Sequence, residues 1–123
     1  MTHLFGAIAA LIACVWPGSL QAADPAAGQS VFKTQCGACH SVVQGKNMVG
    51  PSLFGLLGRK SGIVEGFRYS TANKAADLTW SAFTLDKYLS APREAIPGTT
   101  MIYAGVKDET KRADLIAYLE SIQ

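Results

Sequence analysis

Five consecutive residues constrain this chain more than any other feature: Cys36-Gly37-Ala38-Cys39-His40. They contain two of the three cysteines and one of the two histidines in the whole sequence. Residues three apart on a helical turn lie on the same side, so both sulfurs can reach one bound group. The imidazole of His40 follows directly and can bind a metal ion from that side. The pattern Cys-x-x-Cys-His is the recognised signature for covalent attachment of a c-type haem.

Other sites also use closely spaced cysteines. A disulfide between Cys36 and Cys39 is favoured in an oxidising compartment. Dithiol oxidoreductases place Cys-x-x-Cys after a strand, and no strand pattern precedes Cys36. Structural zinc needs four ligands, and the sequence contains no cysteine or histidine after residue 40. The motif by itself therefore favours covalent haem and leaves a disulfide module as the alternative.

Length and composition predict one small folded domain. The chain has 123 residues, which excludes a multidomain enzyme. It is 49% hydrophobic and 16% charged, a balance that argues against disorder. The formal net charge of +2 is too small to indicate nucleic-acid binding.

The amino-terminal segment is typical of an export signal. Residues 4–15 form an apolar run, shorter than the roughly 20 residues that span a bilayer as a helix. The small residues Ala22 and Ala23 suit a signal peptidase. We expect residues 1–23 to be a cleaved signal peptide and residues 24–123 to be a haem c domain in the bacterial periplasm. The alternatives are a retained anchor, or lipidation at Cys14, because the residues around it resemble a lipoprotein cleavage box.

Local signals predict three helices. Asp24-Pro25 is typical of a helix cap and first turn, and Ser81 and Asp108 are typical caps for two later helices. Gly28 lowers helix propensity, which predicts a close crossing with another helix at that point. Pro92 prevents the second helix from continuing. The predicted helices cover residues 25–33, 82–90 and 109–122.

The segment between the first two helices predicts irregular structure. Residues 45–66 contain six glycines and Pro51. Loops of this length are uncommon in compact domains unless they are functional, and a large prosthetic group would supply the core that they surround. No alternating apolar run of useful length occurs, so we expect a mostly α fold.

Together these features resemble class I c-type cytochromes, especially the mitochondrial type and its bacterial periplasmic relatives. The resemblance extends from about Gly28 to Leu119. The matching stretches, in family order and spacing, are residues 36–40, 50–59, 66–69, 73, 80, 88–89, 96–101 and 114–119.

The resemblance implies the cytochrome c fold, in which short helices and glycine-rich loops surround one haem attached through Cys36 and Cys39. It also implies that His40 and Met101 bind the iron from opposite faces. On residue types alone, Met48 or a lysine could take the second axial position.

Eleven further residues acquire roles from the resemblance. One accepts the second imidazole proton of the haem histidine through its carbonyl oxygen, three donate hydrogen bonds to the haem propionates, and three form a polar network near the methionine. In that order they are Pro51; Arg59, Tyr69 and Trp80; and Asn73, Tyr88 and Thr99. The contact between first and last helices is assigned to Gly28, Phe32, Leu115 and Tyr118.

The implied function is one-electron transfer, because an iron with both axial positions filled has no site open for substrate. We expect a monomeric carrier, not an enzyme, that makes transient contact with redox proteins. A membrane-bound cytochrome complex is the expected donor, and an oxidase, reaction centre or reductase is the expected acceptor. The alternatives are a haem c peroxidase or ligand sensor with a labile Met101, and a membrane-anchored cytochrome subunit of a larger enzyme.

The charges that would steer docking are only partly present. Glu94 and Thr100 occupy positions where the mitochondrial type carries lysine. We therefore expect docking that depends less on salt concentration than in strongly basic relatives. The remaining candidates for a basic rim are Lys33, Lys46, Lys60, Lys87 and Arg93.

Overall fold

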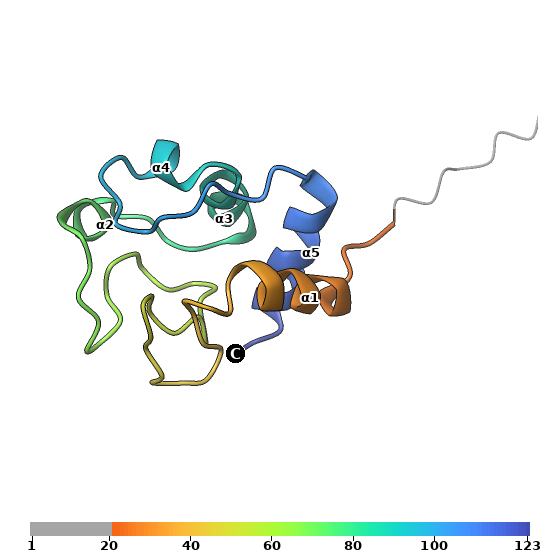
Figure 1. Cartoon of the computed structure of the whole chain (residues 1–123), viewed down its shortest axis with the longest axis horizontal. Helices are drawn as coiled ribbons and strands as arrows, with labels where there is room; N and C mark the ends of the chain where they lie inside the picture. The colour runs from red at the N-terminus through yellow and green to blue at the C-terminus, as the bar shows by residue number, and fades with distance from the viewer. Residues whose placement is uncertain (1–20) are drawn as a thin grey trace, which may run out of the picture.

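The computed structural model describes residues 21–123, which form five helices joined by irregular segments (Figure 1). Residues 1–20, which make up most of the expected signal peptide and include the alternative lipidation site Cys14, lie outside the described residues. No helix within residues 21–123 is both long enough and apolar enough to cross a membrane. The helices are α1 (Pro25–Gln35), α2 (Thr71–Ala75), α3 (Ala82–Ser90), α4 (Pro92–Ala95) and α5 (Glu109–Glu120).

Helix α1 begins as its sequence predicts and crosses α5 at close range. The Asp24 side chain accepts a hydrogen bond from the Ala26 amide at 2.9 Å, and Pro25 occupies the first turn. A Cβ placed on Gly28 would lie 1.9 Å from the Asp114 carbonyl oxygen of α5. The two backbones can therefore approach this closely only because position 28 carries no side chain.

Helix α5 contacts both α1 and α3. Asp108 caps it by accepting from the Lys111 amide at 2.9 Å. The helix ends at Glu120, two residues before the predicted end. Leu115 and Leu119 on its inner face are almost fully buried and form the centre of the hydrophobic core.

Two short helices, α2 and α4, were not predicted. Ser70 caps α2 by accepting from the Asn73 amide at 3.0 Å. Pro92 ends the continuation of α3, as expected, but it also occupies the first turn of α4. Proline is favoured there because its missing N–H has no helical partner at that position. Pro92 therefore prevents α3 from continuing and also begins α4.

The segment from residue 41 to residue 70 contains no helix and forms the loops at the lower left of Figure 1. Residues 21–123 contain no strand, only an isolated antiparallel bridge between Lys60 and Thr79. The Trp80 amide donates to the Arg59 carbonyl at 2.9 Å beside this bridge. The mostly α fold class is confirmed, and the bridge brings Arg59 next to Trp80.

Candidate functional site

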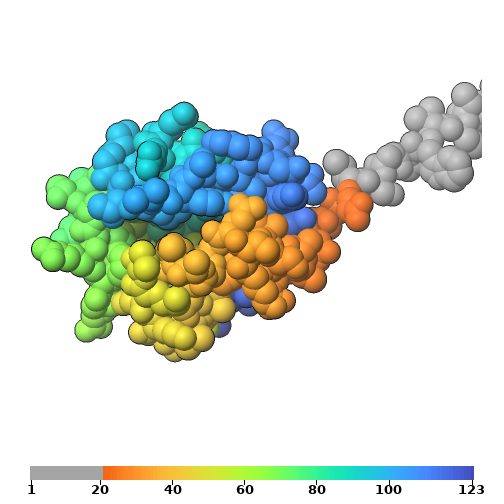
Figure 2. Space-filling view, viewed as in Figure 1, coloured from red at the N-terminus to blue at the C-terminus, as the bar shows by residue number. Residues whose placement is uncertain are grey.

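A cavity of about 390 Å³ opens between the two halves of the molecule. Figure 2 shows the hollow between α1 and the segment after it on one side, and residues around 100 on the other. The volume lies in the usual range for cofactor sites. Most of the lining is apolar, and its leucines are Leu53, Leu56, Leu85, Leu89, Leu115 and Leu119.

All eleven residues predicted for the site line this one cavity, although they span 66 positions of the chain, from residue 36 to residue 101. The two cysteines and the histidine directly follow α1, and the threonine and the methionine lie between α4 and α5. The remaining six belong to α2, to α3 or to the irregular segments before α3. They are Cys36, Cys39, His40, Pro51, Arg59, Tyr69, Asn73, Trp80, Tyr88, Thr99 and Met101.

The two cysteines lie on a turn that continues α1. The amides of Cys39 and His40 both donate to the Cys36 carbonyl, at 3.0 and 2.9 Å. The turn therefore presents both sulfur atoms to the same cavity. Burial, with a smaller contribution from Cys39, raises the pKa of the Cys36 thiol to about 11.

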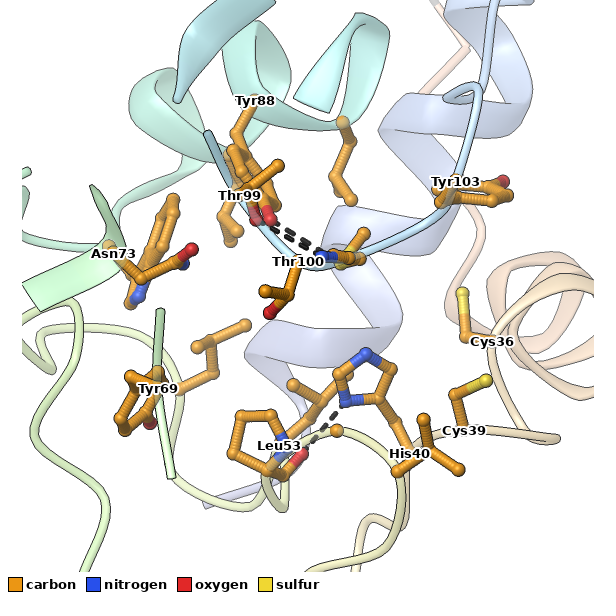
Figure 3. Close-up of a pocket in the computed structure, with 18 of the residues that line it drawn as sticks. Cys36, Cys39, His40, Leu53, Tyr69, Asn73, Tyr88, Thr99, Thr100 and Tyr103 are labelled. Carbon is orange, nitrogen blue, oxygen red and sulfur yellow. Dashed lines mark hydrogen bonds between the residues drawn. The ribbon is translucent and has the colours of Figure 1, made fainter. Parts of the chain in front are cut away.

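His40 is held rigidly in the wall beside the cysteines (Figure 3). Its Nδ1 lies 2.8 Å from the Pro51 carbonyl oxygen. Burial lowers the pKa of His40, with the Pro51 carbonyl opposing part of that effect and Arg59 adding to it. The imidazole is therefore neutral near pH 7, and because a carbonyl only accepts, Nδ1 carries the proton. Nε2 is left with a free lone pair for a metal ion.

A glycine makes room for this imidazole. A Cβ built on Gly50 would lie 2.2 Å from Cε1 of His40 and within 3 Å of both ring nitrogens. The Gly50 amide donates to the Cys39 carbonyl at 2.8 Å, so the backbone on either side of the ring is fastened as well. The ring therefore has little freedom to rotate.

Met101 belongs to a stretch of chain that faces His40 across the cavity, and Figure 3 shows its neighbours Thr99 and Thr100 above the imidazole. Hydrogen bonds to side chains hold Met101 there. The Tyr88 hydroxyl donates to Met101 Sδ at 3.3 Å, and the Met101 amide donates to Thr99 Oγ1 at 3.3 Å (Figure 3). Burial raises the pKa of Tyr88, while the Thr99 and Asn73 side chains oppose part of the rise. Tyr88 is therefore a neutral donor at physiological pH.

Arg59, Tyr69 and Trp80 form a polar end of the cavity. Arg59 donates to the Phe54 and Ser52 carbonyls at 3.2 and 3.0 Å, and its Nε is buried without a partner. Burial lowers the pKa of Arg59 and raises that of Tyr69. A half-buried cation with a buried, unused Nε donor predicts an anionic group of the ligand at this end. The residue types alone would have placed Arg59 in solvent, whereas the structure has it half-buried.

Four polar residues of the lining had no predicted role in the site: Gln35, Ser70, Thr100 and Tyr103. Two of them, Gln35 and Tyr103, form a hydrogen-bonded pair. The Tyr103 hydroxyl donates to Gln35 Oε1. No motif marks this pair, because 68 positions separate them. Met48, the alternative axial ligand, is 42% exposed and does not line the cavity. None of the lysines of residues 21–123 lines it either.

The lining fits haem c in each of its parts. Two cysteine sulfurs and an adjacent imidazole line one side of the cavity, and a methionine thioether lines the facing side. Most of the remaining lining is apolar, and the unpartnered Nε of Arg59 can donate a hydrogen bond to a carboxylate. A ligand with two attachment points, a metal centre, an apolar body and negative charge at one end matches these donors.

Comparison with known proteins agrees with this fit. The family described as Cytochrome c matches residues 25–123. The chain is 50% identical to cytochrome c2 of Blastochloris viridis over 121 residues, 98% of this chain and 93% of the relative. It is 46% identical to cytochrome c2 of Rhodopila globiformis over 86% of this chain and all of the relative. It is 48% identical to cytochrome c of Ginkgo biloba over 79% of this chain and 87% of the relative. The chain therefore belongs to the cytochrome c family: it is an electron-transfer protein, not an enzyme, with one haem c bound covalently through Cys36 and Cys39.

Proposed function

We propose that His40 and Met101 are the two axial ligands of the haem iron in this electron carrier. The observation that carries the proposal is the pair of opposed ligand groups, each with its own hydrogen bond. Nδ1 of His40 is occupied by Pro51, which leaves Nε2 for the iron, and Tyr88 orients the sulfur of Met101. Met101 is also the one methionine that lines the cavity among residues 21–123.

This ligand pair accounts for electron transfer without catalysis. When bound, haem supplies a reversible one-electron change at its iron. A thioether opposite an imidazole raises the reduction potential relative to two imidazoles. With both His40 and Met101 bound to the iron, no position would be left for oxygen or peroxide. The hydrogen bonds from Nδ1 of His40 to Pro51 and from Tyr88 to the sulfur of Met101 orient the two ligands.

The remaining predicted residues receive supporting roles in the proposal. Arg59, Tyr69 and Trp80 bind the propionates, and the unpartnered Nε of Arg59 supports this assignment. Asn73, Tyr88 and Thr99 form the polar network that tunes the potential through the sulfur of Met101. The carbonyl of Pro51 sets the orientation and basicity of His40.

Replacing Met101 tests the ligand assignment. Met101→Ala opens the sixth position, so the ferric protein should lose its weak sulfur–iron band and the ferrous protein should bind carbon monoxide. The potential should fall by on the order of hundreds of millivolts. Met48→Ala is the matched control, since Met48 lies outside the cavity, and it should leave all three properties unchanged. An unchanged band in Met101→Ala would overturn the assignment, and carbon monoxide binding by the unaltered protein would favour the peroxidase or sensor function.

We further propose that residues 1–23 are a cleaved export signal and that the carrier works in the bacterial periplasm. Its donor is a membrane-bound cytochrome complex, and its acceptor is an oxidase, reaction centre or reductase. Two of the most similar relatives are bacterial proteins named cytochrome c2, which supports a bacterial setting. The mass of the purified protein tests the leader, because a retained or acylated amino-terminal segment would make it heavier.

The surface charges support docking with weak salt dependence. Lys60 is paired with Asp77 at 2.8 Å, which offsets its charge. With a net charge of +2 before two propionates are added, little positive charge is left for steering. The rate of oxidation by the natural acceptor should therefore change little between low and high salt. A steep fall in that rate would contradict the proposal.

A further inference from the structure

The cavity lies between two parts of the chain, which we call the two lips. Among the helices of residues 21–123, α1 contacts α5 but neither α3 nor α4. The Cys–His segment (residues 36–40) continues from α1 and belongs to one lip. The Met101 loop (residues 97–105) follows α4 and belongs to the other. Figure 2 shows the hollow between them at the front of the molecule.

The hydrogen bonds of the Met101 loop run almost entirely to its own lip. The Thr99 amide donates to the Ile96 carbonyl at 3.1 Å, and Tyr88 of α3 donates to the sulfur of Met101. Just beyond the loop, the Val106 amide donates to the Leu89 carbonyl at 2.7 Å. None of these contacts ties the loop to α1.

One hydrogen bond within residues 21–123 joins the two lips at the front. The Tyr103 hydroxyl donates to the side-chain oxygen of Gln35, the last residue of α1 and the neighbour of Cys36. Figure 3 shows Tyr103 at the edge of the cavity above Cys36. Both residues also line the cavity. The bond therefore spans the opening between a haem-bearing cysteine and the loop that carries the proposed methionine ligand.

We propose that Tyr103 and Gln35 form a latch that closes the Met101 loop over the cavity and limits the release of Met101 from the iron. The inference rests on the axial role of Met101 proposed above. Tyr103 and Gln35 are positioning residues: neither binds the iron, and both act by holding the loop that does. Opening of the latch lets the loop swing away on its own lip, because the loop has no other hydrogen bond to α1.

The size of the effect follows from the strength of one hydrogen bond between two neutral side chains. A neutral hydrogen bond contributes about 0.5–1.5 kcal/mol net, which corresponds to roughly a two- to tenfold change in an opening equilibrium. Loss of the latch should therefore raise the population of the open loop by about two- to tenfold. A ligand that replaces the methionine when the loop is open should bind faster by that same factor.

The test measures displacement of Met101 by added imidazole in the ferric holoprotein, followed at the sulfur–iron band. Tyr103→Phe removes the donor and keeps the ring, and Gln35→Leu removes the acceptor and keeps the side-chain size. Each variant should react about two- to tenfold faster than the unaltered protein. The double variant should react no faster than the single variants, because one bond is lost in all three. Tyr118→Phe is the control, since Tyr118 packs on Phe32 in the α1–α5 contact, away from the Met101 loop.

A second readout does not depend on added ligand. Amide hydrogen exchange at Thr99 and Met101 should become faster in Tyr103→Phe and Gln35→Leu, but not in Tyr118→Phe. The latch would be overturned if single variants matched the unaltered protein, if Tyr118→Phe gave the same acceleration, or if the effects multiplied in the double variant. Absence of a sulfur–iron band in the unaltered protein would instead overturn the axial role of Met101, so the two failures are distinguishable.

Discussion

The two walls that face each other across the cavity are built in different ways. On the His40 side, backbone hydrogen bonds between residues 36 and 53 hold the chain, and the ligand's own support is a backbone carbonyl. On the Met101 side, the support comes from the side chains of Tyr88, Thr99 and Tyr103, which belong to separate turns of the chain.

This difference has a consequence for how each side responds to mutation. A substitution at Pro51 changes the side chain but keeps the backbone carbonyl that accepts from His40. The position of His40 therefore depends on steric fit and changes little when polar side chains are removed. The Met101 side loses a support whenever one hydroxyl is removed. We therefore expect the histidine to be fixed and the methionine to be adjustable, both in ligand exchange and in reduction potential.

Two glycines give the largest expected contrast. Gly50→Ala should lower the free energy of unfolding by about 3 kcal/mol, because its Cβ would overlap the His40 ring, which is held in place by its hydrogen bond to Pro51. Gly98→Ala should cost only about 1 kcal/mol, for the positive φ of 88° at that position, since its Cβ meets only Ala72 at 3.3 Å. Urea unfolding of both holoproteins measures the difference. Equal losses would remove the steric distinction between the walls.

An intermediate effect is expected on the reduction potential. Tyr88→Phe removes the hydrogen bond to Met101 Sδ, so the sulfur donates more strongly and stabilises ferric iron. The potential should fall by a few tens of millivolts, on the order of the roughly 1 kcal/mol that one hydrogen bond contributes. Pro51→Ala keeps the carbonyl that accepts from His40, so its potential should shift by less than half as much. Redox titration of both variants measures the two shifts in potential. A larger shift in Pro51→Ala than in Tyr88→Phe would contradict the expectation that the methionine side is the more adjustable one.

The smallest effect is expected at Thr99. Thr99→Val keeps the shape of the side chain and removes the acceptor for the Met101 amide, a long hydrogen bond of 3.3 Å. Imidazole should displace the methionine about twofold faster, at the weak end of a neutral hydrogen bond. Thr99→Ser restores the hydroxyl and should restore the original rate. A rate in Thr99→Ser equal to that of Thr99→Val would show that the hydroxyl has no part in holding the loop.

The longer helices could be predicted because their signals are local. Asp24, Ser81 and Asp108 each cap the helix that they were expected to cap. The five-residue helix α2 and the four-residue helix α4 were missed, because so few residues leave no periodic pattern. Ser70, which caps α2, is the signal that could have revealed it.

Site residues were predictable where a motif or a family resemblance marks them. Cys36, Cys39 and His40 are neighbours, and the motif names them. The others lie far apart, and without the resemblance nothing in the sequence would have distinguished Tyr69 or Trp80 from ordinary core residues. Gln35 and Tyr103 lie outside every stretch that matches the family, so their place in the site could not be predicted from the sequence.

The amino-acid sequence by itself determined the attachment chemistry, the predominance of helix and the three helix starts, because each depends on residues within one or two turns. Only the tertiary structure decided which hydroxyl meets which acceptor, that Arg59 keeps an unpartnered buried nitrogen, and that Tyr103 meets Gln35 across the cavity. These contacts depend on the angle at which α1 and α5 cross and on the path of the loops, to which residues throughout the chain contribute. Short-range preferences act within a segment, whereas the placement of distant groups is a property of the whole packed chain.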